Sequence, residues 1–446
     1  MRHLYSALLY VLLPFALLRL LWRSRALPGY RRRIPERFGL FPGPPAAETL
    51  WVHAASVGEV LAAAPLVEAL LATHPRADIL VTTATPTGSA CLLDRFGGRV
   101  RHCYVPWDLP GAVRRFLARA RPRLLVLVET ELWPNLIHFS RARGCRIVLA
   151  NARLSPRSAE RYLSISPLVR PMLEAVDVFA CQSEAIAGRF RALGAQPSAC
   201  RVTGSLKFDI AIDDTARARA AALGEELQLA GRDVVVAGST HPGEEAFMLA
   251  AFAALRGAHD DCLLVLAPRH PERCGQVAER CRAAGWRTRL RSAPAAGPCD
   301  VLLLDTVGEL ALLYSAATVA FVGGSLVDRG GHNVVEAAAW GAPVVCGPHT
   351  RNFHEAVVLL VAAGGLRVVR GPDELGPALG ELLASAERRE AMGAAGRRVV
   401  EENRGALQAL QEVVAEVLAA DAPTSMPRSA GAAAPGRNPG GSRPPG

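Results

Sequence analysis

The feature that most constrains the fold is the alternation, from Leu50 onward, of short apolar runs with amphipathic segments of helical length. The runs are rich in Val, Ile and Leu, which is typical of strands buried on both faces of a parallel sheet. Half of the 446 residues are hydrophobic, which excludes disorder for most of the chain. We therefore predict an α/β chain with two doubly wound domains in tandem. The expected strands are Leu50 to Ala54, Ile79 to Thr83, Leu124 to Val128, Ile147 to Ala150 and Val178 to Cys181, then Val234 to Ala237, Leu263 to Ala267, Val301 to Leu304, Val319 to Val322 and Pro343 to Cys346.

Sheets of this kind bind ligands at the carboxyl ends of their strands, and two facing domains form a cleft between those ends. The segments that directly follow the predicted strands are rich in glycine and polar residues. They read HAASVGE, TTATPTGS, ETELWPN, GSTHPGEE, APRHPER and VGGSLVDRGGHNVVE. We expect the functional residues in these segments.

The basic excess of the chain lies at its ends. Residues 1–37 hold eight Arg and one Glu, residues 422–446 hold three Arg and no acidic residue, and the middle is balanced. This distribution argues against a nucleic-acid-binding face on the body. Leu4 to Trp22 is apolar apart from Arg19 and is just long enough to cross a bilayer. A secretory signal and a buried helix are the alternatives, but no small-residue cleavage site follows. We expect an uncleaved membrane anchor, spanning or interfacial, with the Arg-rich flank and the body on the cytoplasmic side.

Cysteine and carboxylate spacings give no sign of a metal site. The ten cysteines include no C-x-x-C pair and no zinc-type spacing with His, which predicts a reduced, cytoplasmic protein. An Asp-x-Asp triplet, a common way to hold a metal on a nucleotide diphosphate, is missing from the sequence.

Glu59 lies in Ser56-Val57-Gly58-Glu59, just after the first predicted strand and at the start of a helix. A glutamate in this position commonly only complements the helix dipole. A carboxylate beside a cleft can also act as a general base toward an acceptor hydroxyl. Both interpretations stay open on the pattern alone.

Glu129 and Glu131 follow the apolar run LLVLV. A charge at the end of a buried strand needs a partner, and the edge that faces a cleft is the least costly place for it. We expect Glu129 to be functional and at least one of the two carboxylates to be structural, paired with Arg153 or Arg157.

Lys207 is the only lysine among 51 basic residues, and it lies in GSLKFD at the join between the predicted domains. Retention of one lysine suggests a need for a compact ammonium that a planar guanidinium cannot imitate, with chance as the alternative. Such a cation would stabilise negative charge on a leaving group or an anionic sugar.

The sharpest local pattern is Gly323-Gly324-Ser325 followed by residues 330–336, GGHNVVE, between a strand and a helix. Free amides and a helix start suit a phosphate, and a glutamate in the next turn suits ribose hydroxyls. Residues 306–309 and Arg269-His270 follow neighbouring strands, so three nucleotide-suited loops converge on one cleft. His332 is better explained as a packed hydrogen-bond donor than as a catalytic base.

The order of these motifs resembles that of the 3-deoxy-D-manno-octulosonic acid (Kdo) transferases of lipopolysaccharide synthesis. The resemblance covers about residues 1–420 and rests on WVHAASVGE, TTATPTGS, ETELWPN, NARLSPRSAERY, VTGSLKFD, GSTHPGEE, PRHPER and FVGGSLVDRGGHNVVEAAA. It implies a GT-B glycosyltransferase, with two Rossmann-like domains facing across a cleft, at the cytoplasmic face of the inner membrane. It also implies transfer of Kdo from CMP-Kdo to the 6'-hydroxyl of the tetraacylated lipid A precursor, with inversion and without a metal or other cofactor.

The resemblance also implies roles for individual residues. Glu59 would accept the proton of the lipid hydroxyl, and Glu129 and Lys207 would assist the transition state. This sequence has Val307 where Met is expected and Val334 where Pro is common, and both would contact CMP through the backbone. The CMP contacts would be Pro268, Arg269, Val307, Gly308, Glu309, Asn333, Val334, Val335 and Glu336.

The expected domains are an anchor with its basic flank (1–37), an acceptor-binding domain (38–208), a CMP-Kdo-binding domain (209–420) whose last helices could return to the first, and a disordered low-complexity tail (421–446). The expected partners are CMP-Kdo, the lipid A precursor and the inner membrane, with no nucleic acid. Two alternatives stay open, namely another GT-B nucleotide-sugar enzyme, such as an epimerase, and an inactive membrane-tethered relative.

Overall fold

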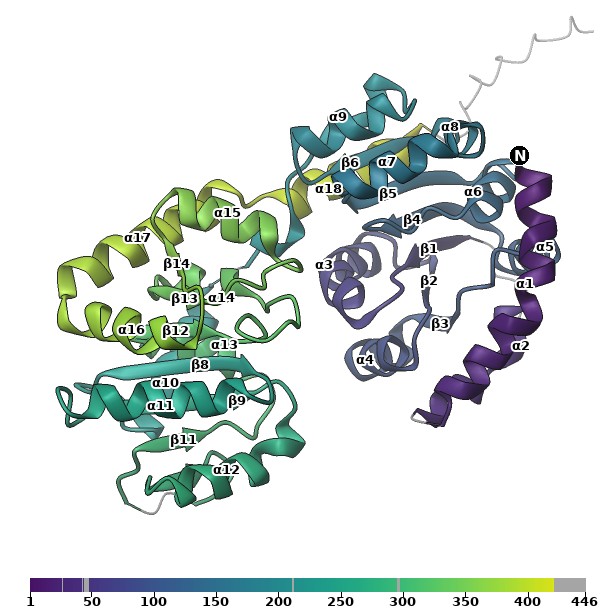
Figure 1. Cartoon of the computed structure of the whole chain (residues 1–446). Helices are drawn as coiled ribbons and strands as arrows, with labels where there is room; N and C mark the ends of the chain where they lie inside the picture. The colour runs from purple at the N-terminus through teal and green to yellow at the C-terminus, as the bar shows by residue number, and fades with distance from the viewer. Residues whose placement is uncertain (26, 42, 44–47, 211, 295–296, 421–446) are drawn as a thin grey trace, which may run out of the picture.

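The computed structural model describes residues 1–25, 27–41, 43, 48–210, 212–294 and 297–420. Within them the chain forms two α/β domains, each built on a seven-stranded parallel sheet (Figure 1). This confirms the predicted tandem of doubly wound domains, and all ten predicted strands are present. The predicted tail, 421–446, lies outside the described residues.

The first sheet has the strand order β3-β2-β1-β4-β5-β6-β7. Its strands alternate between two apolar layers: Trp51 faces one, and Leu50 and Val52 face the other. Both faces are therefore buried, as the continuous apolar runs require. The strands are β1 (Thr49–His53), β2 (Asp78–Thr83), β3 (Arg101–Tyr104), β4 (Pro122–Val128), β5 (Arg146–Ala152), β6 (Val178–Cys181) and β7 (Cys200–Val202). The helices are α3 (Val57–Thr73), α4 (Pro86–Phe96), α5 (Pro110–Ala120), α6 (Pro134–Arg141), α7 (Pro156–Ser164), α8 (Ser166–Glu174) and α9 (Glu184–Ala192).

The second sheet has the strand order β10-β11-β9-β8-β12-β13-β14 and is likewise covered on both faces. The strands are β8 (Val234–Thr240), β9 (Leu263–Pro268), β10 (Thr288–Leu290), β11 (Val301–Leu303), β12 (Val319–Val322), β13 (Val344–Cys346) and β14 (Leu366–Val368). The helices are α10 (Asp214–Glu226), α11 (Glu244–Arg256), α12 (Cys274–Ala283), α13 (Leu310–Leu313), α14 (Val334–Trp340), α15 (His354–Ala362), α16 (Leu375–Ala384) and α17 (Ala386–Glu402).

The chain crosses between the domains twice. The first crossing contains a 3-10 turn, η4 (Leu206–Phe208), and the second leads from α17 into α18 (Ala406–Ala419). Figure 1 shows α18 reaching back over the first domain, where Leu410 and Val414 join the apolar layer of α3. Asp209 ties the crossings together, since its carboxylate accepts hydrogen bonds from the amides of Gly405 (2.6 Å) and Leu407 (2.5 Å).

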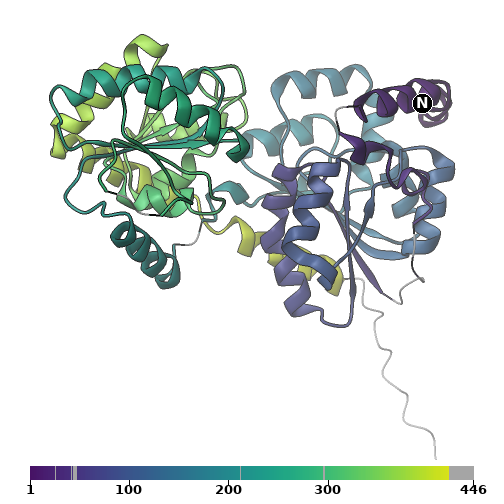
Figure 2. The ribbon, with the colours of Figure 1, turned by 90° about the horizontal axis from the view of Figure 1, so that it is seen from below.

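The N-terminal helix α1 (Arg2–Arg23) lies along the side of the first domain that faces away from the second (Figures 1 and 2), ahead of the short α2 (Ile34–Arg37). By length and composition it is apolar enough to cross a membrane, with a mean hydropathy of 2.0. Its first turns are held by polar contacts: the guanidinium of Arg2 donates to Oδ1 of Asn135 (3.2 Å), and the amide of Asn135 donates to Oγ of Ser6 (3.0 Å). Asn135 is fully buried under this helix.

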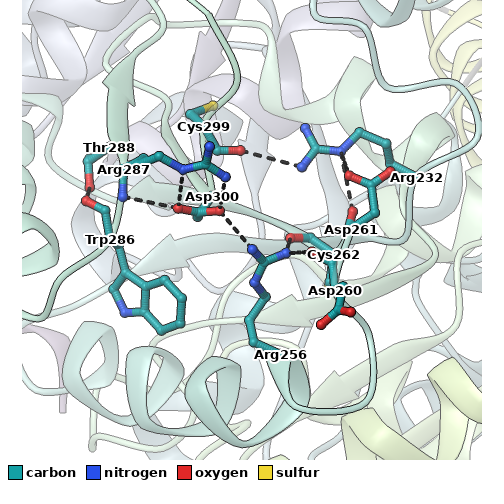
Figure 3. Close-up of polar contacts among 10 residues, drawn as sticks. All are labelled: Arg232, Arg256, Asp260, Asp261, Cys262, Trp286, Arg287, Thr288, Cys299 and Asp300. Carbon is teal, nitrogen blue, oxygen red and sulfur yellow. Dashed lines mark hydrogen bonds and ion pairs between the residues drawn. The ribbon is translucent and has the colours of Figure 1, made fainter.

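A polar network closes the end of the second sheet opposite to the carboxyl ends of its strands. Figure 3 shows Asp300, which directly precedes β11, between Arg256 (2.9 Å) and Arg287 (2.8 Å). Its side chain is only 7% exposed. Hydrogen bonds from Arg287 hold the pKa of Asp300 below its ordinary value. The network joins α11 to the two strands at the β10 edge and lies away from the cleft, so its role is stability.

Candidate active site

A cavity of about 680 Å³ lies between the two domains, at the carboxyl ends of both sheets. Six of the predicted site residues line it, three from the first domain and its crossing and three from the second. They are Glu59, Glu129, Lys207, Arg269, Asn333 and Glu336. Carboxylates and cations from both domains therefore meet in one space.

Glu59 closes the first turn of α3. Oε2 accepts a hydrogen bond from the amide of Ala55 (2.8 Å), and Oε1 accepts one from the hydroxyl of Ser56 (2.9 Å), which caps the helix. The carboxylate thus acts much like the glutamate of a capping box, with the amide of Ala55 in place of that of Ser56. Burial raises its pKa from 4.5 to about 7, although the Ala55 amide acts in the opposite direction. A carboxylate with this pKa in a cleft can take up a proton near neutral pH.

Glu129 directly follows β4 and has a left-handed conformation, with φ of 64°. Asn151, the next-to-last residue of β5 (φ 51°), and Ser239, the next-to-last residue of β8 (φ 55°), share this rare conformation. All three lie near the carboxyl ends of central strands, where the chain turns beside the cleft. Strain of this kind concentrates at functional sites, because it fixes side chains in directions that a relaxed strand end would not give.

The prediction that the structural carboxylate pairs with Arg153 or Arg157 is wrong for Glu131. Its carboxylate accepts a hydrogen bond from the indole of Trp133 (2.7 Å), and Oε2 lies 3.5 Å from Nε2 of His53. The pKa of Glu131 is lowered: His53 and Trp133 together outweigh burial, which is the largest single influence and acts upward. Glu131 is therefore the structural carboxylate of the pair.

Lys207 reaches from η4 to the second domain. Its ammonium donates to the carbonyl of Asn352 (2.8 Å) and lies 4.5 Å from the ring centre of Phe353. Burial lowers its pKa, while the nearby carboxylate of Glu129 acts to raise it. Arg153 makes a parallel bridge by donating to the carbonyl of Arg351 (3.0 Å). A compact cation thus lies in the cleft, within the electrostatic reach of Glu129.

The second domain contributes Arg269, Asn333 and Glu336. Arg269 follows β9, whose last residue is Pro268, and its amide donates to the carbonyl of Thr240 (2.9 Å). Asn333 caps α14 and donates to Glu336 (2.9 Å), whose pKa is raised by burial. Val334 and Val335 are buried in the core, so only their backbone could meet a ligand.

The loop of Val307, Gly308 and Glu309 is placed differently from expectation. Within the described residues, none of the three lines the cavity between the domains. Val307 is 88% exposed, and Glu309 forms an ion pair with Arg291 (3.0 Å). The structure does not bring this loop into the cavity with Arg269 and Glu336.

The interpretation of Gly323-Gly324-Ser325 as a source of free phosphate-binding amides is wrong. The amides of Gly324, Ser325 and Leu326 all donate to the carboxylate of Glu244, at 2.7 to 3.0 Å. The following part of the loop does line the cavity, through Gly331, His332 and Asn333. Only this second part can meet a ligand in the cleft.

Sequence reasoning also missed the partner of His332. Nε2 of His332 lies 2.9 Å from Nε2 of His241, and the two rings stack at 5.1 Å. Burial, followed by the charge of Arg269, lowers the pKa of His332 to about 4, so one neutral ring donates to the other. The motif GSTHPGEE contains both His241 and Glu244, but its pattern does not show what they face. Among the described residues, no group of three or more His, Cys, Asp or Glu is placed to hold a metal ion.

Known proteins are similar to this chain over most of its length. A family model described as 3-deoxy-D-manno-octulosonic-acid transferase (kdotransferase) matches residues 32–210. The 3-deoxy-D-manno-octulosonic acid transferase of Haemophilus influenzae is 40% identical over 418 residues, which are 93% of this chain and 98% of that protein. The chain belongs to the Kdo transferase family. The transferase of Bordetella pertussis is also 40% identical, over 86% of this chain and 92% of its own length. The chain is therefore a glycosyltransferase.

Solved structures place the fold in the GT-B class. The UDP-GlcNAc 2-epimerase of Neisseria meningitidis, bound to UDP-GlcNAc, superposes with a TM-score of 0.56 over 84% of this chain and all of its own. A glycosyltransferase of Rickettsia africae gives 0.53 over 84% of this chain and 99% of its own. The sequence identities, 13% and 12%, are so low that the likeness shows the fold alone.

Proposed function

We propose that this Kdo transferase moves Kdo from CMP-Kdo to the 6'-hydroxyl of the tetraacylated lipid A precursor in lipopolysaccharide synthesis, with inversion at the anomeric carbon. The observation that carries the proposal is the placement of Glu59 in the cleft with a pKa of about 7. A single displacement needs one base on the acceptor side and cations on the donor side. Glu59 lies on the first domain, and Arg269 comes from the second.

In this mechanism Glu59 accepts the proton of the lipid hydroxyl while the oxygen of that hydroxyl attacks the anomeric carbon of Kdo. The bond to the phosphate of CMP breaks at the same time, and CMP leaves with the electron pair. Lys207 stabilises the charge that develops in this transition state, and Glu129 assists by orienting the ammonium. Arg269, Asn333 and Glu336 hold the nucleotide.

The donor carries a single phosphate, and the sequence contains no Asp-x-Asp triplet to hold a metal on a diphosphate. We therefore propose that the reaction needs no metal or other cofactor. The residues of the 306–309 loop, Val307, Gly308 and Glu309, would contact CMP only if this loop itself moved within the second domain toward Arg269 and Glu336. Pro268, Val334 and Val335 would contribute backbone contacts.

Mass spectrometry of the lipid A precursor tests the proposal. The precursor is incubated with CMP-Kdo and the detergent-solubilised protein, with and without EDTA, beside the Glu59→Gln variant. We expect a gain of one or more Kdo units in both wild-type samples, and a gain about 10²- to 10⁴-fold slower in the variant. No gain with folded wild-type protein and intact donor would refute the proposal and favour an inactive relative or another acceptor.

We further propose that α1 lies in the plane of the cytoplasmic surface of the inner membrane. Its first turns are tied to buried Asn135, while one stripe of its surface is apolar and open. The stripe follows a helical repeat, at Leu4, Leu8, Val11, Phe15, Leu18 and Trp22, each at least half exposed. The Arg-rich flank after the helix suits anionic lipid.

Spin labels at Leu4, Val11 and Leu18 test this orientation in vesicles that contain anionic lipid. An in-plane helix puts all three labels at one shallow depth. A label at Val11 that lies near the bilayer centre, with the labels at Leu4 and Leu18 both shallower, would show a spanning helix. Absence of binding to the vesicles would refute the membrane contact itself.

A further inference from the structure

Glu244 is a fully buried carboxylate that lies outside the mechanism described above. It is the first residue of α11, and residues 241–243 separate it from the end of β8. Oε2 accepts hydrogen bonds from the amides of His241 (2.9 Å) and Gly324 (2.7 Å). Oε1 accepts them from the amides of Ser325 (3.0 Å) and Leu326 (2.9 Å). Four donors saturate the two oxygens, which is the full capacity of a carboxylate.

The glycine-rich turn that binds Glu244, residues 323–326, is hydrogen-bonded to the part of the loop that lines the cleft. The carbonyl of Gly324 accepts from the amide of Gly331 (2.8 Å), and the carbonyl of Gly323 accepts from the amide of His332 (3.2 Å). Gly331, His332 and Asn333 line the cavity. An unbroken series of hydrogen bonds therefore leads from the carboxylate to the residues that face the nucleotide.

The backbone around this turn is packed too closely to accept a side chain at Gly323 or Gly324. A Cβ on Gly323 would lie 2.7 Å from the carbonyl oxygen of Ser239 and 2.9 Å from Oε2 of Glu244. Gly324 has φ of 68°, and a Cβ there would lie 2.8 Å from the ring of His332. The two glycines allow the loop to approach β8 closely enough for one carboxylate to collect amides from both segments.

We propose that Glu244 is a positioning residue for the donor side of the cleft. It supplies the anion that this glycine-rich turn binds, so the turn is an internal brace and not a phosphate site. The brace fixes the position of residues 331–336 on the donor side of the cleft, and the phosphate of the donor is left to Arg269. The inference rests on the proposed use of CMP-Kdo, and its test separates the two.

Glu245 provides a matched control. It follows Glu244 on α11, is equally buried, and pairs with Arg273 (2.7 Å) and the hydroxyl of Thr240 (3.3 Å). Replacing either glutamate by glutamine removes a buried charge from the same turn of the same helix. Within the contacts described, only Glu244 is bonded to the glycine-rich turn. A general loss of stability should therefore affect both variants, and a loss of donor binding should affect only one.

The experiment measures CMP affinity by calorimetry, the KM for CMP-Kdo, the KM for the lipid acceptor, kcat and the melting temperature. Glutamine at position 244 places an NH2 group against two amide donors, so Glu244→Gln should raise the donor KM and the CMP dissociation constant about tenfold or more. The acceptor KM should stay within about threefold. Glu245→Gln should leave both donor constants near those of the wild type. Glu244→Asp, which keeps the charge on a shorter side chain, should be intermediate.

Equal donor constants in Glu244→Gln and Glu245→Gln would overturn the inference. So would failure of both Glu244 variants to fold while Glu245→Gln folds, because the role would then be in folding alone. A wild-type protein that neither binds CMP nor transfers Kdo would instead refute the proposed function.

Discussion

Replacement of Glu59 by glutamine separates the two roles of this side chain, the cap of α3 and the proposed base. Glutamine fits the cap if its carbonyl oxygen accepts from the Ala55 amide and its NH2 group donates to the Ser56 hydroxyl, which can accept. These contacts span 2.8 and 2.9 Å in the native protein. The start of the helix should keep its geometry, while the side chain can no longer take up a proton.

The expected kinetic loss follows from general base catalysis. Removal of such a base costs about 10²- to 10⁴-fold in kcat, while the donor KM should change by no more than about threefold. Burial raises the pKa of Glu59 to about 7. In the wild type, kcat/KM should therefore rise about tenfold per pH unit below pH 7 and level off above it. The variant should lack this rise.

The free energy of unfolding should fall with rising pH over the range in which kcat/KM rises. The pKa of Glu59 in the folded protein, about 7, lies above its ordinary value of 4.5, so folding favours the protonated form. Its contribution to the free energy of unfolding is complete below pH 4.5 and is lost as the pH rises to 7. At about 1.4 kcal/mol per pKa unit the loss is at most about 3.5 kcal/mol, and less because the cleft admits water. Glu59→Gln should therefore be at least as stable as the wild type at pH 8 and lose this advantage at pH 5.

Mass spectrometry of the lipid product gives the rates, and urea unfolding at pH 5 and 8 gives the stabilities. A variant with near-native kcat, or one that keeps the rise below pH 7, would remove Glu59 as the base. A variant less stable than the wild type at pH 8 but not at pH 5 would refute the assignment of the raised pKa to burial.

Two further predictions concern cations and carboxylates elsewhere. Lys207→Arg should lower kcat by at least about tenfold. The compact ammonium contacts both the Asn352 carbonyl and the ring of Phe353, and a planar guanidinium, which spreads its charge over three nitrogens, cannot keep both contacts. Wild-type activity in the transfer assay would show that the single lysine is retained by chance. Asp300→Asn should lower the free energy of unfolding by about 1 to 3 kcal/mol at pH 7 and leave the donor KM unchanged. The pKa of Asp300 is lowered in the folded protein, so this contribution exists above the ordinary pKa and is lost as the pH falls through the folded value. Thermal unfolding at pH 7 and pH 3 should show the gap between variant and wild type closing, and a constant gap would contradict the ion-pair explanation.

The sequence pattern predicts the interior of both sheets and misses their borders. The four strands without a prediction are β3 and β7 in the first sheet and β10 and β14 in the second, and each is an edge strand. Each has three or four residues. Edge strands are covered less completely, so they need no continuous apolar run, and their residues read as loop.

The candidate site shows the same division between pattern and geometry. Glu59, Glu129 and Lys207 could be selected because each is a charged residue at the end of a strand or at a domain join. The role of Glu244 could not, because one of its four partners, His241, directly follows β8 and the other three come from a loop about 80 positions away in the chain. A carboxylate that binds backbone amides leaves no mark on the sequence of its partners. For the same reason, the sequence of the glycine-rich turn suggests a phosphate site, although its amides bind Glu244.

The return of α18 has a practical consequence for dissecting the molecule. Because this helix packs on the first domain, that domain is not one continuous piece of the chain, whereas the second is. A fragment that begins at 209 and runs to 420 would carry the apolar face around Leu410 and Val414 into solvent and should aggregate. A soluble second domain should end near Asn403. The first domain should regain its missing helix when α18 is supplied as a separate peptide.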